Sequence, residues 1–177
     1  MPCGTSSATT THPYAEATTD KGDSLSVEGT AKGAVTAVER EVQPKDLPKP
    51  VATSVKSKFP KLTVEGALAV YKGDDIRDLG KAELTYQVNG EAAKGKDLTV
   101  ELTPDGKVLE TRREVETSDV PKEVLTALKA KAPKFQTSMV HKITREKETV
   151  GFLFAGKGKR TAYVSADGKE VEIHKDD

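Results

Sequence analysis

One segment of this sequence occurs twice, and the repetition constrains the fold more than any other feature. Residues 46–62 read DLPKPVATSVKSKFPKL, and residues 119–135 read DVPKEVLTALKAKAPKF. Nine of the 17 aligned pairs are identical, whereas chance would give roughly one or two. We therefore infer an internal duplication.

Each copy has the pattern of a short amphipathic helix. Val51, Val55 and Phe59 are spaced four residues apart, and the second copy repeats this apolar stripe. Asp46 and Asp119 are expected as N-caps, because an aspartate oxygen can accept hydrogen bonds from the free N–H groups of a first turn. A proline after each stripe disfavours helical backbone at the preceding residue and is expected to end the helix.

Alternating apolar and polar residues follow each helix and predict β-strands. Asp-Gly pairs at 105–106 and 167–168 predict a tight turn before the last strand of each copy. The expected strands cover 62–71, 81–88, 96–102 and 107–116 after the first helix, and 135–148, 149–156, 159–166 and 169–174 after the second.

These patterns predict an α+β fold, with two tandem helix-plus-four-strand antiparallel units that share or abut a sheet. The expected divisions are residues 1–45 for a leading segment, 46–118 for the first repeat and 119–177 for the second. One unit of about 60 to 70 residues buries little apolar area, so two units that pack together are expected to form a more stable core.

The leading segment differs in composition from the repeats. Residues 1–23 are rich in Ser, Thr and Ala and lack periodicity, so we expect them to be disordered. A short strand or a partly helical lead-in is expected before residue 45. Cys3-Gly4 ahead of a Ser/Thr-rich stretch resembles the start of a mature bacterial lipoprotein, which makes Cys3 a candidate for lipidation. The alternative is an unpaired cysteine in a polar tail.

Charge and aromatic content argue against several classes of partner. Lys+Arg and Asp+Glu both number 28, and this balance argues against a nucleic-acid-binding protein. The absence of Trp and the small number of Phe and Tyr argue against stacking on bases. No apolar run approaches the roughly 18 residues of a membrane-spanning helix. We therefore expect a soluble folded part that contacts a membrane only through a lipid on Cys3.

The sequence predicts no reactive centre. A single cysteine excludes an intrachain disulfide and a cysteine-based zinc site. His12, His141 and His174 lack the spacing of a metal motif, and the last two could meet only if their strands were neighbours. No serine or cysteine has an activating base in a recognisable pattern. We expect no enzymatic activity, no catalytic or metal site and no cofactor.

The second copy, followed by strands and closing on DGKEVEI, resembles the PepSY-like modules of secreted and periplasmic bacterial proteins. These modules belong with the β-lactamase-inhibitor-like fold, in which two tandem units build one sheet. The resemblance covers residues 46–174 and rests on the proline-led helix, the Lys-x-Pro exit and the Asp-Gly-Lys hairpin. The long leading segment departs from the family, as does Ala132, where the first copy has Phe59.

This resemblance implies a non-enzymatic, periplasmic or secreted protein that binds or inhibits a protein or peptide. The alternative is a small-ligand or cation sensor that uses the groove between the repeats. Tyr and Arg are enriched at interface hot spots, so tyrosines and arginines at outward strand positions are the candidate partner-binding residues. Ordinary sheet surface is the alternative for each of them. The candidates are Tyr71, Tyr86, Arg112, Arg113 and Tyr163.

Overall fold

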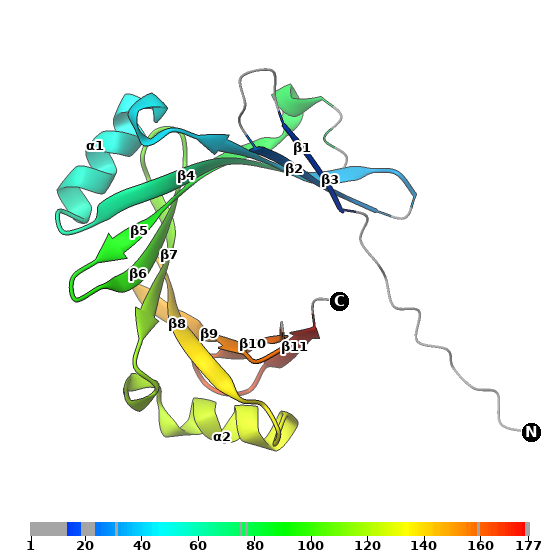
Figure 1. Ribbon diagram of the computed structural model, residues 1–177, viewed down its shortest axis with the longest axis vertical. Coiled ribbons are helices and arrows are strands. Elements are labelled where there is room, and N and C mark those ends of the chain that lie inside the picture. Colours follow the sequence, from blue (N-terminus) through cyan, green and yellow to red (C-terminus); the bar gives the residue numbers. More distant parts are fainter. Residues whose placement is uncertain are drawn as a thin grey trace, which may run out of the picture. The chain divides into compact units, whose positions relative to one another are not determined.

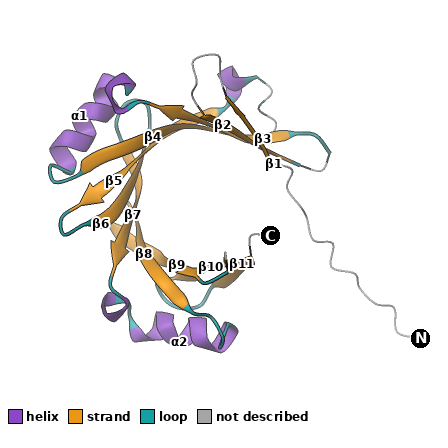
Figure 2. Ribbon diagram, viewed as in Figure 1, coloured by secondary structure: helices purple, strands orange, loops and turns teal. Residues whose placement is uncertain are grey.

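The computed structural model describes residues 14–18, 24–30, 32–74, 76, 78–158 and 160–175. These residues form eleven strands and two α-helices, and the strands follow one another in a single sheet in chain order (Figures 1 and 2). The helices are α1 (Lys49–Lys58) and α2 (Lys122–Lys131). The strands are β1 (Tyr14–Thr18), β2 (Ser24–Gly29), β3 (Val35–Val42), β4 (Thr63–Lys72), β5 (Glu83–Ala92), β6 (Lys96–Leu102), β7 (Val108–Val115), β8 (Thr137–Arg145), β9 (Glu148–Gly156), β10 (Arg160–Ser165) and β11 (Val171–Lys175).

The predicted fold class is wrong. The protein is dominated by one eleven-stranded sheet with two helices of ten residues, and it is not built of two helix-plus-four-strand units. The ladder between β7 and β8 runs antiparallel from Glu110↔Arg145 to Val115↔Val140, so hydrogen bonding continues across the expected division at residues 118–119. The individual helices and the strands expected after them are present, but they belong to one sheet that also includes three further strands.

Three further strands come from the segment before the first repeat. Antiparallel pairing joins β1 to β2 and β2 to β3. The expectation of disorder is therefore wrong for residues 14–18, while the rest of that segment, including Cys3, lies outside the described residues. Little in the sequence indicates these strands, because β2 buries no side chain and β3 buries one, Val38. Strands without a buried face show no regular apolar alternation.

The chain divides into two compact units, and each is described by itself. Unit 1 comprises Met1–Val42 and Leu68–Thr85, and unit 2 comprises Gln43–Ala67 and Tyr86–Asp177. In unit 1 the buried apolar residues are Val38, Ala69, Val70 and Ile76. The Ile76 N–H donates to the Val35 carbonyl oxygen at 2.8 Å, which joins the segment after β4 to β3.

Unit 2 contains both α-helices, and its main core lies under α2. The predicted stripe is confirmed, since Val124 is fully buried and Leu128 is 5% exposed. These side chains pack with Phe152 and Phe154 of β9 and with buried residues of β8 and β10. On α1 the corresponding Val51 and Val55 are buried as well. Figure 1 shows both helices on the same side of the sheet.

The helix ends follow the sequence only in part. Each helix ends before its proline as expected, and the N–H groups of Phe59 and Ala132 donate back to the Val55 and Leu128 carbonyl oxygens. The expected N-caps are wrong, because Asp46 and Asp119 each end a 3-10 turn and no side chain caps either helix. Each helix instead begins directly after a proline, whose fixed φ sets its start.

The two predicted Asp-Gly turns are confirmed, and each turn contacts one of the helices. Gly106 and Gly168 have φ values of +86° and +70°, a conformation that glycine adopts without strain. A Cβ on Gly106 would lie 2.6 Å from the Pro50 carbonyl oxygen, and one on Gly168 would lie 3.2 Å from the Glu123 carbonyl oxygen. Each turn therefore packs closely against the first part of its helix.

Two glycines in the paired strands of unit 2 offer a matched test of packing. A Cβ on Gly90 would lie 2.0 Å from the Thr63 carbonyl oxygen, whereas the atoms nearest to one on Gly66 would belong to the Asn89 side chain, the first at 3.1 Å. We expect Gly90→Ala to lower the free energy of unfolding by about 2 kcal/mol or more, because backbone must move. Gly66→Ala is expected to change it by less than about 1 kcal/mol, because a side chain can shift. Urea denaturation of both variants measures the difference, and equal losses would contradict the assigned packing.

Candidate functional site

The strand register sorts the side chains of unit 2 onto two faces. Thr111 lies opposite Val100 on β6 and Thr144 on β8, so these three share the face that carries the helices, the helix face. Their neighbours along each strand point the other way. We call this second face the open face, because neither α-helix lies on it. The side chains of the open face that form the candidate site are Glu110, Arg112, His141, Arg145 and Tyr163.

A buried carboxylate between two arginines is the centre of the open face. Arg112 Nε donates to Glu110 Oε1 at 2.6 Å, and Arg145 Nε donates to Glu110 Oε2 at 2.7 Å. The Glu110 side chain is 7% exposed, whereas the side chains of Arg112 and Arg145 are 39% and 62% exposed. Glu110 and Arg145 are direct partners in the β7–β8 ladder, so the backbone register holds this arrangement in place.

The two arginines keep Glu110 ionised. Burial raises the pKa of the Glu110 carboxyl, but the hydrogen bonds from Arg112 and Arg145 outweigh burial, and the pKa lies below its usual value. The same contact raises the pKa of Arg145. A carboxylate held in this way is a poor general base, because its affinity for a proton is low.

Both guanidinium groups still have donors to offer. An arginine side chain carries five N–H donors, and each of these arginines uses its Nε toward Glu110. Among the described residues, no hydrogen bond to another side chain or carbonyl uses the terminal Nη atoms of Arg112 or Arg145. Glu110 therefore orients two partly exposed guanidinium groups whose outer N–H groups can bind an incoming carboxylate.

Tyr163 lies flat against the neighbouring strand. Its hydroxyl donates to the Val150 carbonyl oxygen at 3.1 Å. A Cβ on Gly151 would lie 2.5 Å from the Tyr163 ring, so the glycine makes room for the ring. Burial raises the pKa of the Tyr163 hydroxyl, and Arg145 opposes this only in part. The ring is thus a fixed, half-buried aromatic surface near Arg145.

His141 adds a titratable group to the same face. It lies opposite Glu114 on β7, whose carboxylate accepts from Lys96 Nζ at 2.9 Å. Burial lowers the pKa of His141, although Asp97 and Glu114 act in the opposite direction. His174 is on β11, and β9 and β10 separate it from the strand of His141, so the two rings are not on neighbouring strands.

The structure distributes the predicted partner-binding residues over different surfaces. Arg112 and Tyr163 lie on the open face. Arg113 lies opposite Leu98, and Tyr86 lies opposite Leu102, which places both on the helix face. Tyr71 belongs to unit 1. Arg112 and Arg113 cannot share a face, because successive side chains of a strand alternate.

Sequence reasoning missed Glu110 and Arg145. Because side chains two residues apart on a strand point to the same face, the sequence does place Glu110 on the face of Arg112. Arg145 is 35 residues away from Glu110, and only the β7–β8 register brings them together. No sequence signal distinguishes this buried glutamate from the other charged residues of LETRREVE.

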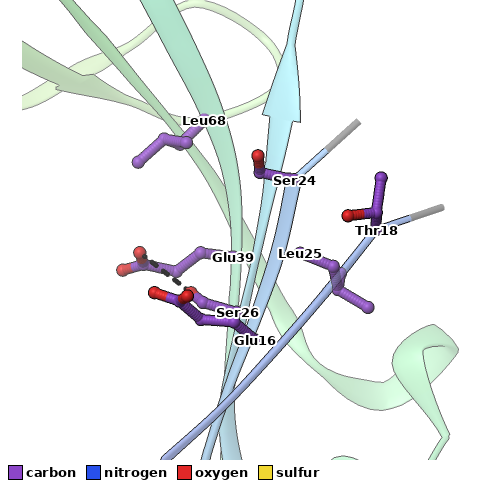
Figure 3. Close-up of a pocket in the computed structure, with 7 residues that line it drawn as sticks. All are labelled: Glu16, Thr18, Ser24, Leu25, Ser26, Glu39 and Leu68. Carbon is purple, nitrogen blue, oxygen red and sulfur yellow. Dashed lines mark hydrogen bonds between the residues drawn. The ribbon is translucent and has the colours of Figure 1, made fainter. Parts of the chain in front are cut away.

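Two hollows also open on the surface of the units. In unit 1 a polar hollow of about 380 Å³ lies beside β1 and β2 (Figure 3). Its two carboxylates belong to Glu16 and Glu39, and Ser26 Oγ donates to Glu39 at 3.5 Å. No group of three metal-ligating side chains occurs among the described residues, here or elsewhere. In unit 2 a second hollow of about 520 Å³ lies on the helix face beside Phe59, and we call it the Phe59 hollow.

Neither α-helix of the described chain is long and apolar enough to cross a membrane. No protein-family model matches this sequence, and no curated protein matches it. Solved structures with a similar fold come from Bacteroides. A DUF2874 family protein from Bacteroides ovatus is 15% identical, with a TM-score of 0.50 over 71% of this chain and 86% of that one.

Two further structures are similar. A BLIP-like protein from Bacteroides fragilis is 15% identical, with a TM-score of 0.49 over 73% of this chain and 87% of that one. A DUF2874 family protein from Bacteroides uniformis is 16% identical, with a TM-score of 0.49 over 71% and 88% of the two chains. The likeness to the Bacteroides ovatus protein shows a shared fold and carries no information on function.

Removing the charge of Glu110 tests whether the carboxylate organises the open face. We expect Glu110→Gln to lower the free energy of unfolding by about 1–3 kcal/mol, because two close guanidinium groups lose the anion between them. The control is Glu65→Gln, at an exposed position of β4. Urea denaturation near neutral pH measures both, and an equal effect of the two substitutions would show that Glu110 has no special part.

The lowered pKa of His141 predicts how stability depends on pH. The unfolded chain takes up this proton near the usual pKa of 6.5, whereas the folded protein takes it up only at lower pH. The free energy of unfolding should therefore fall as the pH drops through 6.5 and below. We expect His141→Gln to flatten this dependence between about pH 7.5 and 5.5. Urea titrations at several pH values give the comparison, and an unaltered slope in His141→Gln would refute it.

Proposed function

We propose that this protein is a non-enzymatic extracytoplasmic binding module that recognises a protein or peptide through the open face of unit 2. The observation that carries the proposal is the Arg112–Glu110–Arg145 arrangement on a face without a helix. Paired arginines with free outer donors suit an acidic side chain or a chain terminus of a partner. Tyr163 supplies a fixed aromatic surface beside them, and such residues are typical of interface hot spots.

The absence of an enzymatic reaction is part of the proposal. Glu110 is ion-paired at both oxygens and has a lowered pKa, which suits a structural anion better than a proton acceptor. His141 lies beside Glu114, and no serine or cysteine nucleophile faces it in the strand ladders that flank β8.

A periplasmic or secreted location, with lipidation of Cys3, belongs to the same proposal. It rests on the Cys3-Gly4 start and on the resemblance of the repeats to PepSY-like modules within the β-lactamase-inhibitor-like fold. The matching helices, each entered after a proline and each packed against an Asp-Gly turn, support a common origin of residues 46–118 and 119–177. Mass spectrometry of the N-terminus of the native protein tests lipidation directly.

A second candidate function is small-ligand binding, and the Phe59 hollow favours it. Residues of the first copy and of the β8–β9 turn line this hollow together, so it corresponds to the groove between the repeats. Three lysines and one glutamate among its lining residues make it unsuitable for a cation. The lining residues therefore favour an anionic or neutral small ligand for this second candidate function.

Adjacent arginines on opposite faces provide the test of partner binding. The immobilised protein is used to capture a partner from a cell-envelope extract of the source bacterium, and the purified partner is then titrated. We expect Arg112→Ala to weaken binding by about tenfold or more, because a partly buried charge-assisted contact is lost. Arg113→Ala, on the helix face, is expected to leave the affinity unchanged.

Thermal unfolding of both variants shows whether they remain folded before they are compared. Equal affinities of the two variants, or a loss confined to Arg113→Ala, would remove the open face from the proposal. Tyr163→Phe should bind as the wild type does, because its hydroxyl is already engaged with the Val150 carbonyl oxygen.

A further inference from the structure

The Phe59 hollow combines an apolar floor with a rim of cations. Phe59, Val108 and Leu109 contribute apolar surface, and all three are only half-buried. Thr111 and Thr144 add hydroxyl groups to the lining. The volume of about 520 Å³ is in the range of small-molecule sites, which is roughly 300–1,000 Å³.

A bulge in β7 turns two successive side chains toward the hollow. Leu102 pairs with Val108 and Glu101 pairs with Glu110, so Leu109 is an extra residue without a partner on β6. In a regular strand, Val108 and Leu109 would point to opposite faces. The bulge allows both to line the hollow, and bulges commonly redirect side chains next to functional sites.

A strained turn forms the opposite side. The two-residue turn between β8 and β9 consists of Glu146 and Lys147, with φ values of +46° and +74°. Such turns favour Asn-Gly, because left-handed backbone is costly for other residues. Both residues line the hollow, and the β8–β9 register also shifts between Ile143 and Thr144. Strain of this kind concentrates at functional sites.

The internal repeat shows that the Phe59 ring is not needed to end the helix. Ala132 is the C-cap of α2, as Phe59 is the C-cap of α1, and the backbone angles and cap hydrogen bonds of the two are similar. A methyl group therefore suffices at this position. The aromatic ring is present at Phe59 and absent at Ala132, and it lines the hollow.

The charges around the hollow favour an anion. Its lining includes Lys58, Lys107 and Lys147, against the single carboxylate of Glu146. All three lysines are exposed, and within the described part of the chain none of them forms an ion pair with a carboxylate. A ligand carboxylate at the rim would find three cations that form no ion pair in the described chain, one of which, Lys107, also acts electrostatically on Asp105.

We propose that the Phe59 hollow binds an aliphatic carboxylate, with the alkyl chain on Phe59, Val108 and Leu109 and the carboxylate among the lysines. This inference names the ligand class of the second candidate function and does not depend on the open face. An acidic peptide fits less well. Peptides commonly gain affinity from a free strand edge, and β7 and β8 are both paired on both sides.

The test is isothermal titration of the full chain with decanoate below its micelle concentration, with butyrate and decyltrimethylammonium as ligand controls. We expect Phe59→Ala to weaken decanoate binding by about tenfold, because aromatic contact area is lost. Phe59→Ala should fold, since Ala132 occupies the equivalent position. The double variant Lys107→Gln/Lys147→Gln should weaken binding by about threefold at low salt and reduce its salt dependence.

Arg112→Ala, on the open face, is the matched control and should bind decanoate as the wild type does. The proposal is overturned if decanoate binds Phe59→Ala and the lysine variant with unchanged affinity, or if decyltrimethylammonium binds as tightly. It is also overturned if decanoate does not bind, and binding of a blocked Glu-Phe-Glu peptide in that case would make the hollow a peptide site. Loss of partner binding in Arg112→Ala leaves this result untouched, so the two proposals fail separately.

Discussion

The antiparallel ladder between β7 and β8 is the contact on which the rest of unit 2 depends. It joins the last strand of the first copy to the first strand after α2, from Glu110↔Arg145 to Val115↔Val140. Without it the two copies would each end in a free strand edge, which exposes unpaired N–H and C=O groups and favours association with other chains. With it, α1 and α2 lie on one side of a continuous sheet, and the other side carries neither helix.

The same ladder gives the open face its chemistry. Glu110 and Arg145 meet because they are direct partners, and Arg112 reaches the same carboxylate from two residues further along β7. A slip of one residue in this register would move Arg145 to the helix face and leave Glu110 with one arginine fewer. The register between β7 and β8 therefore sets which charges are neighbours on the open face.

The two segments with similar sequence form similar helices and turns, and local differences distinguish them. The hairpins after β6 and β10 both place a left-handed glycine against a helix. The first copy, however, has a phenyl ring where the second has a methyl group, and its last strand carries the bulge at Leu109. These differences meet at the Phe59 hollow.

The sequence by itself determined the local elements. Two helices were specified by the spacing of Val51 and Val55 and of Val124 and Leu128, because apolar residues four apart form one stripe. The Asp-Gly pairs specified two turns, because glycine tolerates positive φ. Tertiary structure decided how far the sheet extends. Because β1–β3 bury almost no side chains, their sequences lack the apolar alternation that would predict strands. Tertiary structure also decided that Arg112 lies on the open face and Arg113 on the helix face, and that Glu110 is buried against an arginine 35 residues away. Such pairings depend on the hydrogen-bond register between strands, and register is a property of two segments together that neither segment encodes alone.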